Sequence, residues 1–375
     1  MKMKWVFWIS AAVVGYSYLG YPLWLWLRSR WSPRPVRRGA QEPTVSAVMV
    51  VRDEEAVIGG KVNNLLALDY PAEKLEVIVV SDGSSDGTAA VLAQFKDDSR
   101  VRTIVKSASQ GKAAGLNDAI QSARGEVLLF TDARQQIEPG ALRLLLENFA
   151  DPDVGAASGE LMLGDPASGE TAKGMGVYWR IEKTIRELES SSGSVAGATG
   201  AIYCARRGLL DPIPEGTILD DVLLPMQVVR RGSRVVFDSR ARAWDSPNLG
   251  EGREFWRKVR TLSGNYQLLQ LAPWLLTGQN PIRFEFVSHK LSRLAVPFGL
   301  LGLLIASMFL PQPFFRAALV VQLGFYALSL AALGEFRVGP LSRVADVART
   351  FVVLNSAAMV AFINFVTGRK AIWVR

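Results

Sequence analysis

Two aspartates that follow a buried-strand pattern are the first candidates for chemistry. In VIVVSDGSSDGT, residues 77–88, an apolar run ends at Asp82 and Asp86, which small and flexible residues separate. Open α/β sheets bind ligands outside the carboxyl ends of their strands. Carboxylates at that edge can hold sugar hydroxyls, a base edge or a metal ion. Asp86 also precedes the helix-like stretch TAAVLAQF, so a turn that caps this helix is the alternative.

A second strand end of the same kind favours the site over the cap. The strand predicted at residues 127–130 leads directly into Asp132. Because the carboxyl ends of parallel strands meet at one edge of a sheet, Asp82 and Asp132 are expected to share that edge. Two neighbouring strand ends that each present a carboxylate indicate a binding site.

Alternating elements are expected to position these residues between Thr44 and about Asp245. Apolar runs and helical periodicity predict strands at 45–51, 75–80, 101–105 and 126–130, and helices at 53–68, 88–95, 111–123 and 138–149. The first helix is expected to place Val57, Val62, Leu65 and Leu66 on one face. Alternation of strands and helices implies right-handed crossovers and a mainly parallel α/β sheet of the nucleotide-binding type.

Composition narrows the class of protein. The chain has 375 residues, 49% of them hydrophobic, which is high for a purely soluble enzyme. The single Cys204 excludes an internal disulfide, and with the single His289 it offers no zinc constellation, so a metal would be a hard, oxygen-bound ion. A net charge of +8 suits basic membrane flanks or phosphate binding. The sequence does not interleave aromatic and basic residues in the way that would favour a nucleic-acid partner.

The N-terminal segment reads as a transmembrane helix. Residues 5–27 carry no charge, have about the length of a bilayer span, and place Trp and Tyr near both ends. Bulky aromatics before the following charges argue against a cleavable signal peptide. Five arginines come next, which by the positive-inside rule places the following domain in the cytoplasm: Arg28, Arg30, Arg34, Arg37 and Arg38.

The C-terminal third also has membrane character. Residues 251–290 resemble a basic amphipathic segment at the membrane surface, and apolar stretches at 294–310, 315–333 and 351–366 are near spanning length. The expected organisation is an N-terminal transmembrane helix (1–28), an α/β domain (44–250), an interfacial segment (251–290), about three transmembrane helices (291–367) and a tail (368–375).

The charges of the C-terminal connections do not all fit one topology. The connection with Arg337, Arg343 and Arg349 falls on the cytoplasmic side, as the charge rule requires. The tail, with the basic residues Arg369, Lys370 and Arg375, falls on the opposite side, which the rule disfavours. A re-entrant or interfacial last segment would remove this conflict.

Six ordered motifs resemble those of family 2 glycosyltransferases, in particular bacterial poly-N-acetylglucosamine, hyaluronan and cellulose synthases. They cover about residues 44–265 and read VVRDEEAVI, SDGSSDGT, QGKAAGLNDAI, TDARQ, TILDDVLLPMQVV and RKVRT. The resemblance implies a GT-A type, nucleotide-sugar-binding domain with a mainly parallel sheet, flanked by N-terminal and C-terminal transmembrane helices. It also implies a bacterial inner (plasma) membrane location with the catalytic domain in the cytoplasm.

Four residues of the first three motifs are donor-binding candidates through this resemblance. It places Glu54 near the nucleotide, Asp82 on the uracil or ribose of a UDP-sugar, and Lys112 on the diphosphate, with Asn117 about one turn further on. The alternative for Glu54 is a favourable charge at the positive end of a helix. Without the resemblance, Lys112 would be an ordinary surface lysine.

The fourth motif departs from the family pattern. Where the family commonly has Asp-x-Asp, TDARQ supplies Asp132 but puts Arg134 in the second position. One carboxylate can still hold Mg²⁺ or Mn²⁺ if donor phosphates and waters complete the shell. Arg134 is a donor-binding candidate that either contacts the phosphates or points to solvent.

The fifth motif carries the candidate base. Attack of a sugar hydroxyl on an anomeric carbon needs a base close to the acceptor oxygen. The resemblance assigns that role to Asp221, with Asp220 as its neighbour. Because adjacent carboxylates repel, the more buried of the two is expected to have the raised pKa. The alternative is that both serve as an N-terminal helix cap.

The sixth motif bears on product length. Arg260 matches the family arginine that clamps the diphosphate, Arg257 replaces a glutamine, and Thr261 replaces the tryptophan associated with the acceptor end of a growing polymer. The alternative for these basic residues is contact with anionic lipid. A Gly/Ala-rich loop before this motif, GSVAGATGAIYCARR, adds the acceptor-region candidates Tyr203, Arg206 and Arg207.

The leading hypothesis is an inverting glycosyltransferase that moves a sugar from a nucleotide-sugar to a growing glycan at the membrane. A second is single transfer to a lipid phosphate or lipid-linked acceptor. A third, a transporter with a regulatory nucleotide-binding domain, is disfavoured because the apolar stretches carry almost no ionisable residues. Amides such as Asn355 and Asn364 could line a polymer path. The expected partners are the donor, the glycan or lipid-linked acceptor and membrane lipids.

Overall fold

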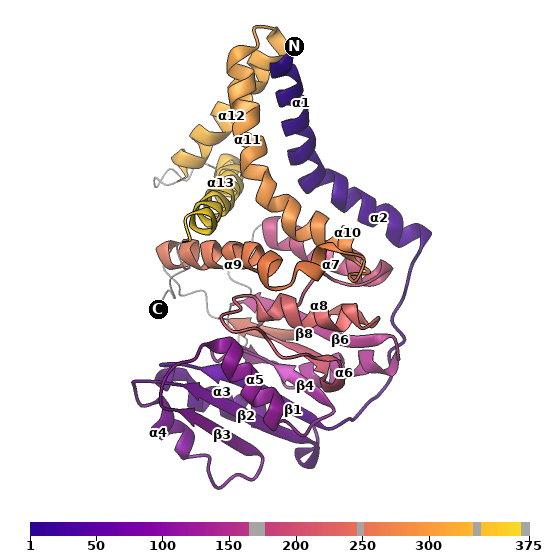
Figure 1. Cartoon of the computed structure of the whole chain (residues 1–375), viewed down its shortest axis with the longest axis vertical. Coiled ribbons are helices and arrows are strands. Elements are labelled where there is room, and N and C mark those ends of the chain that lie inside the picture. The colour runs from indigo at the N-terminus through magenta and orange to yellow at the C-terminus, as the bar shows by residue number, and fades with distance from the viewer. Residues whose placement is uncertain (165–176, 246–250, 333–338, 369–375) are drawn as a thin grey trace.

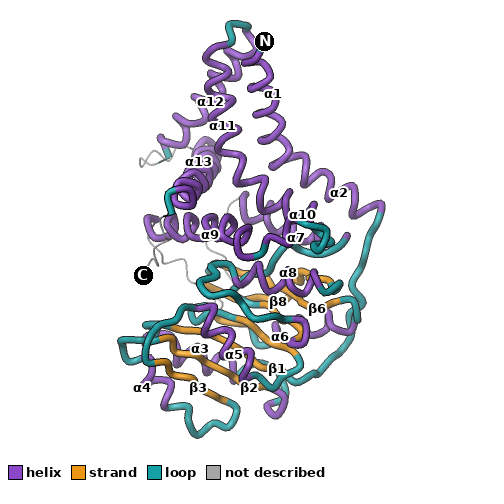
Figure 2. Tube along the Cα trace, viewed as in Figure 1, coloured by secondary structure: helices purple, strands orange, loops and turns teal. Residues whose placement is uncertain are grey.

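The computed structural model describes residues 1–164, 177–245, 251–332 and 339–368. Strands gather in one half of the molecule and long helices fill the other half (Figures 1 and 2). Three helices lie between the halves in this view: α7 (Val177–Ser192), α9 (Glu251–Leu271) and α10 (Arg283–Phe286). The α/β part and the apolar helices expected from the sequence therefore form distinct layers of one molecule.

One eight-stranded sheet organises the α/β part. Its order is β3-β2-β1-β4-β7-β6-β8-β5. The strands are β1 (Val45–Val51), β2 (Leu75–Asp82), β3 (Val101–Lys106), β4 (Val127–Phe130), β5 (Gln136–Ile137), β6 (Val154–Leu163), β7 (Tyr203–Arg206) and β8 (Arg234–Asp245). The first four pair in parallel, which confirms the mainly parallel sheet. Strand β7 runs antiparallel to β4, so its first residue, Tyr203, lies beside Phe130 at the carboxyl end of β4.

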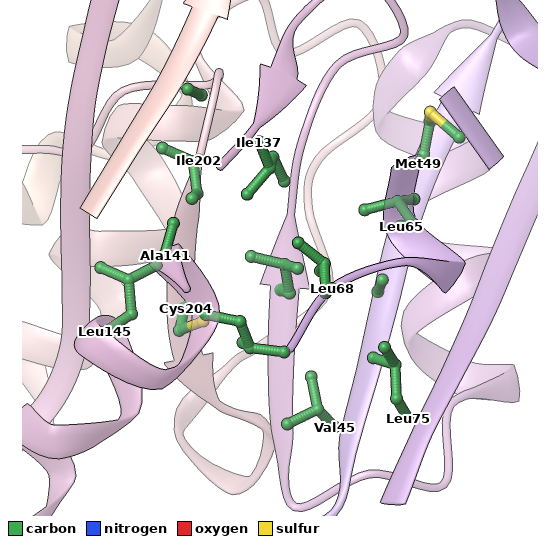
Figure 3. Close-up of a cluster of buried hydrophobic side chains, with 14 of the residues drawn as sticks. Val45, Met49, Leu65, Leu68, Leu75, Ile137, Ala141, Leu145, Ile202 and Cys204 are labelled. Carbon is green, nitrogen blue, oxygen red and sulfur yellow. The ribbon is translucent and has the colours of Figure 1, made fainter. Parts of the chain in front are cut away.

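Helices cover both faces of this sheet. On one face, α3 (Glu55–Leu66), α4 (Thr88–Ala93) and α6 (Ala141–Glu147) pack on a core that includes Met49 and Ile137 (Figure 3). On the other, α5 (Lys112–Ser122) and α8 (Asp220–Arg230) pack on a core that includes Val48 and Phe130. Successive residues of a strand point to opposite faces, which is why Val48 and Met49 belong to different cores.

The buried face of α3 differs from the expected one. Ile58, Val62 and Leu65 are buried, whereas Val57 is 36% exposed. The spacing of the three buried residues matches one face of a helix, because residues three and four positions apart lie on the same side. The expectation for Val57 was therefore wrong, and Ile58 takes its place in the core.

Four helices in the described parts of the chain are long and apolar enough to cross a membrane. They are Lys2–Trp31, Arg283–Phe309, Pro313–Ala331 and Val344–Val366. They comprise α1 (Lys2–Gly15), η1 (Tyr16–Gly20) and α2 (Tyr21–Trp31) near the N-terminus, and α10, η6 (Val287–Leu291), α11 (Ser292–Phe309), α12 (Pro313–Ala331) and most of α13 (Gly339–Val366). Arg337 and the basic tail residues from 369 onward lie outside the described residues.

A buried polar cluster joins the N-terminal helix to α7 and to the second apolar helix. Tyr21 Oη donates to Glu189 Oε1 at 2.6 Å, and His289 Nδ1 lies 2.8 Å from the same oxygen. Arg28 pairs with Glu285 across the same junction. Buried polar groups of this kind are costly to separate, so the cluster holds the helices against the α/β part. The single histidine therefore has a structural role in this cluster. Arg28 likewise forms a contact within the protein.

Candidate active site

Two helix N-termini and one strand end converge above the β4–β7 pair. Lys112 is the first residue of α5, and Asp220 is the first residue of α8. Lys112 Nζ lies 2.9 Å from Asp132 Oδ1 and 3.3 Å from Asp220 Oδ2. Three residues from separate sequence motifs therefore meet around one ammonium group, as the expected site requires.

The candidate base, Asp221, lies close to Asp132, because both side chains approach Gly200. A β-carbon at Gly200 would lie 3.3 Å from Asp132 Oδ2 and 3.6 Å from Asp221 Oδ2, so both carboxylates face this glycine. A side chain there would be tight against Asp132 and in ordinary contact with Asp221. The pocket formed in this way is lined by Val48, Lys112, Leu116, Phe130, Thr131, Asp132, Gly200, Tyr203 and Asp220. The Gly/Ala-rich loop is thus part of the site wall.

The charged groups in the pocket change one another's pKa values. Burial and the neighbouring charge of Asp220 raise the pKa of Asp221 to about 6, although Lys112 acts in the opposite direction. Burial alone would lower the pKa of Lys112, but the charges of Asp132, Asp220 and Asp221 more than offset it, so its pKa is raised. Lys112 is therefore a fixed cation, and Asp221 is a carboxylate that takes up a proton close to neutral pH.

Asp221 is the acid whose pKa is raised, and burial is the largest cause. Asp220 beside it is 5% exposed, and its Oδ2 lies 3.3 Å from Lys112 Nζ. The expectation that the more buried of the two acids has the raised pKa stays a prediction. Leu219 holds the N-cap position of α8 and makes no side-chain capping bond, so both acids lie in the first helical turn rather than at the cap.

The carboxylates of the second motif stabilise loops in this structure. Asp82 accepts hydrogen bonds from Ser109 Oγ at 2.7 Å, Gln110 N at 2.8 Å and Gly111 N at 2.9 Å. Burial would raise the pKa of Asp82, but these donors outweigh it and lower the pKa. Asp82 thereby fixes the turn from which Lys112 projects. Its contact with uracil or ribose stays a prediction.

Asp86 stabilises the turn before α4, although Gly87 holds the N-cap position of that helix. Asp86 Oδ1 accepts from Thr88 N at 3.0 Å, at the start of α4, and its Oδ2 accepts from Glu55 N at 3.1 Å. The acidic run that begins α3 is thus tied to the turn after β2.

Arg134 forms an ion pair with Glu54. The sequence had predicted that Arg134 either contacts the donor phosphates or points to solvent, and neither expectation included this pair. Arg134 Nη2 donates to Glu54 Oε1 at 3.0 Å, and Nε donates to the same carboxylate at 3.2 and 3.3 Å. Because Arg134 is about half exposed, the pair contributes at most ~1 kcal/mol to stability. The donor-binding roles of both residues stay predictions, and a bound anion would compete with Glu54 for this guanidinium.

Asn117 has both polar groups of its side chain engaged by one backbone segment. Its Nδ2 donates to Ile213 O at 2.8 Å, and its Oδ1 accepts from Ile213 N at 2.8 Å. The amide therefore holds the loop that leads to α8. Its expected donor contact would require this pair of bonds to break, so the structure favours a supporting role for Asn117.

Helix α9 contacts the site through its later turns. Gln267 Nε2 donates to Gly216 O at 2.8 Å, and its Oε1 accepts from Ile218 N at 2.9 Å, which fixes the loop just before Asp220. Arg260 lies about two turns earlier on the same helix, and Arg257 is exposed. In the described parts of the chain, Arg257 forms no side-chain ion pair with the pocket residues. The diphosphate roles of both arginines stay predictions.

The other arginine candidates of the Gly/Ala-rich loop support the fold. Arg206 donates to the backbone oxygens of Val154 and Phe149, both at 2.9 Å, and Arg207 donates to Gly125 O at 2.9 Å. These bonds hold the far end of β7, whereas Tyr203 at its near end lines the pocket.

Lys61 is a supporting residue that the sequence analysis missed. Its ammonium is buried and donates to Thr131 Oγ1 at 2.9 Å and to Gln135 O at 2.6 Å, on either side of Asp132. Burial lowers the pKa of Lys61 to about 7. The available signal was its position, because Lys61 falls within the stripe of Ile58, Val62 and Leu65 that α3 buries.

Replacement of Lys61 by methionine should loosen the turn that carries Asp132. The change keeps most of the side-chain volume but leaves Thr131 and Gln135 without their donor, which costs about 1–3 kcal/mol. We expect a lower unfolding temperature and a lower apparent affinity for the divalent cation in turnover assays. Lys74→Met, which removes an exposed lysine paired with Glu42, is the matched control. Equal behaviour of both variants would contradict this role.

A divalent cation fits this site only in part. Asp132 is 44% exposed at its side chain and turns its Oδ2 toward Gly200, so it can serve as a ligand. Arg134 supplies no second carboxylate, and the described residues contain no group of three or more His, Cys, Asp or Glu that could hold a metal ion. The residues present therefore suit an ion that is held mostly by substrate phosphates.

The fold and the pocket define a GT-A type domain. Parallel strands β1 to β4 present Asp82 and Asp132 at their carboxyl ends, where open α/β sheets bind nucleotides. Residues 46–212 match the family model "Glycosyl transferase family 2". This stretch of the chain is thus similar to family 2 glycosyltransferases, which confirms the resemblance seen in its motifs.

Relatives with known activities share this region. The chain is 29% identical to beta-monoglucosyldiacylglycerol synthase of Synechocystis over 192 residues, which is 50% of this chain and 40% of that protein. It is 24% identical to poly-beta-1,6-N-acetyl-D-glucosamine synthase of Staphylococcus aureus over 229 residues, 60% of this chain and 55% of that protein. The chain spans about half the length of these curated relatives.

One solved structure shares the fold over nearly the whole chain. It is the mannosyltransferase PcManGT from Pyrobaculum calidifontis in complex with GDP-Man and Mn²⁺. The TM-score is 0.73 at 22% identity, and the match covers 97% of this chain and 100% of that one. The expected fold class, a GT-A type domain with N-terminal and C-terminal apolar helices, is therefore confirmed.

Proposed function

We propose that the chain is an inverting glycosyltransferase that passes a sugar from a nucleotide-sugar to an acceptor hydroxyl at a membrane surface. The observation that carries this proposal is the convergence of Lys112, Asp132 and Asp220 in one pocket at the end of β4, with Asp221 beside Gly200 in its wall. A cation for the leaving diphosphate and a carboxylate that accepts a proton near neutral pH are the two groups that sugar transfer needs.

Each of these residues has a separate role in the proposed reaction. The acceptor oxygen attacks the anomeric carbon on the side opposite the diphosphate, the new bond inverts that carbon, and the carbon–oxygen bond to phosphate breaks with its electron pair. Asp221 takes the proton of the acceptor hydroxyl. Lys112 faces the charge that develops on the leaving diphosphate, and Asp220 holds Lys112 in place. Mg²⁺ or Mn²⁺ bound at Asp132 would help to neutralise this charge.

The pH profile should report the state of Asp221. A base works only when deprotonated, and the pKa of Asp221 is raised to about 6. We therefore expect kcat/KM to rise about tenfold per pH unit below 6 and to level off above it. The measurement is initial rate at low donor concentration across pH 5–8. A profile that is flat through pH 6, on protein whose fold is unchanged over that range, would contradict the assignment.

The membrane is the proposed location of the acceptor. Helices α7 and α9 lie between the α/β part and the four candidate spans, and Gln267 of α9 holds the loop before Asp220 (Figure 1). The basic stretch after the first span supports a cytoplasmic α/β part, in a bacterial plasma membrane. In this arrangement the pocket lies on the membrane side of the domain, where a growing glycan or a lipid-linked acceptor can reach it.

A growing glycan is the first acceptor that we propose, and a lipid-linked acceptor is the second. The second is favoured by Thr261, whose Oγ1 donates to Arg257 O at 3.0 Å and offers no aromatic face to a sugar. Trp274 stacks with Arg230 at 5.0 Å, whereas Trp256 is 50% exposed and could form such a platform.

Product length distinguishes the two acceptors. Purified full chain in nanodiscs would receive a labelled nucleotide-sugar with an excess of glycan oligomer or of glycolipid. Long products beside untouched oligomer are the outcome that polymer extension predicts. Uniform addition of one sugar to the lipid would instead establish the second acceptor, and no labelled product with either would contradict the proposed activity.

A further inference from the structure

Tyr203 places a phenol hydroxyl in the pocket with a fixed ring. The side chain is 1% exposed, and its ring stacks on Phe130 with ring centres 4.5 Å apart and planes 8° from parallel. Both residues are partners in the β4–β7 ladder. Because backbone pairing and ring stacking both fix the position of the Tyr203 ring, the sheet and not a mobile loop sets the position of its hydroxyl.

This hydroxyl has no hydrogen-bond partner among the described residues. Buried polar groups almost always have a partner, and a buried tyrosine hydroxyl usually finds one. Tyr203 lines the same pocket as Lys112, Asp132 and Asp220. A ligand group in that pocket would satisfy a donor that the protein itself leaves unpaired.

The charged residues around Tyr203 indicate which kind of ligand group its hydroxyl can bind. Burial, together with the charges of Asp220, Asp221 and Asp132, raises the pKa of Tyr203 well above its ordinary value, so the phenol keeps its proton and donates. These three carboxylates also offer hydrogen-bond acceptors near the phenol. They favour a group that accepts from the phenol and donates to a carboxylate. A sugar hydroxyl does both, whereas a phosphate oxygen only accepts.

We infer that Tyr203 Oη donates a hydrogen bond to a sugar hydroxyl and thereby takes part in the choice of the donor sugar. The inference rests on the proposed function, since it requires a nucleotide-sugar in this pocket. The donor is favoured over the acceptor because Lys112 and Asp132, which share the pocket with Tyr203, are the groups proposed to face the donor diphosphate. Tyr203 is then a specificity residue for the sugar.

The test compares Tyr203→Phe with the wild type in calorimetric binding without acceptor. The change removes only the hydroxyl and keeps the ring stacked on Phe130. We expect affinity for the accepted nucleotide-sugar to fall about tenfold, the effect of losing one hydrogen bond. Affinity for the nucleoside diphosphate should stay unchanged. Tyr70→Phe, which removes a hydroxyl that donates to Pro43 O in the opposite core, should change neither affinity.

A second measurement uses donors that each lack one sugar hydroxyl. We expect one of these donors to bind the wild type about tenfold more weakly than the complete donor does. That same donor should bind Tyr203→Phe and the wild type with equal affinity. Equal binding of the complete donor to both proteins would overturn the inference, as would equal losses for donor and nucleoside diphosphate, or an effect on the acceptor KM alone. A wild type that binds no nucleotide-sugar would instead overturn the proposed function, and the inference with it.

Discussion

Replacement of Asp221 by asparagine should reduce sugar transfer by about 10²–10⁴-fold, because the amide cannot take the proton of the acceptor hydroxyl. The side chain keeps its shape, and Asp221 lies in the first turn of α8 without a capping bond, so folding should change little. Donor affinity should also persist, since Lys112 contacts Asp132 and Asp220 and makes no ion pair with Asp221. Initial rates and donor binding, measured on the same preparation, test this expectation.

A matched control separates the role of the base from a general loss of charge. Asp211→Asn makes the same substitution in an exposed carboxylate that pairs with Arg231. Exposed pairs contribute about 0–1 kcal/mol, so this variant should retain wild-type rates. Turnover of Asp221→Asn at the wild-type rate, with donor binding intact, would rule out Asp221 as the base.

Removal of divalent cations should stop turnover, and Asp132→Asn should lower it by about two orders of magnitude or more. Asp132 supplies the one carboxylate of its motif, and the loss of several kcal/mol of charge stabilisation corresponds to such a factor. Activity should return when Mg²⁺ or Mn²⁺ is added to the wild type. Calorimetry should detect cation binding only when nucleoside diphosphate is present, because one carboxylate leaves most of the ion's ligands to phosphate and water.

Asp118→Asn is the control for this prediction, since Asp118 pairs with Lys106 and has an exposed side chain outside the pocket. It should keep both activity and its dependence on the cation. Full wild-type activity in excess chelator would show that lysine and arginine side chains replace the ion entirely. Tight cation binding without nucleotide would show that the protein supplies more ligands than Asp132.

The first half of the fold was predictable because its residues carry strong local signals. Strands β1 to β4 are apolar runs that end in polar turns, and the helices between them have regular apolar spacing. Strand β6, VGAASGELML, is rich in Gly and Ala, so hydrophobic pattern alone does not mark it. Its pairing with β7 and β8 depends on contacts between distant segments, which a local pattern does not contain.

The site was predictable to the extent that its members are charged residues at the ends of elements. Lys112, Asp132 and Asp220 are such residues, and the structure brings them into contact. Hydrogen-bond partners were not readable from the motifs. For this reason the loop-holding bonds of Asp82 and Asn117 were not foreseen.

The contributions of Gly200, Lys61 and Tyr203 also required the structure. Gly200 matters because two carboxylates approach it, and Lys61 because its buried ammonium spans the turn around Asp132. Tyr203 matters because its hydroxyl is buried with no partner in the parts of the chain that the structure describes. Each property arises from packing between segments that are far apart in the chain.

Release of nucleoside diphosphate tests the central claim most directly. Purified full chain, with Mn²⁺ and a mixture of glycan and glycolipid acceptors, would be offered a panel of nucleotide-sugars one at a time. We predict release from one or a few donors that depends on acceptor and falls to background in Asp221→Asn. The account would be contradicted if the folded wild type released no nucleoside diphosphate from any donor, or if Asp221→Asn released it as fast as the wild type.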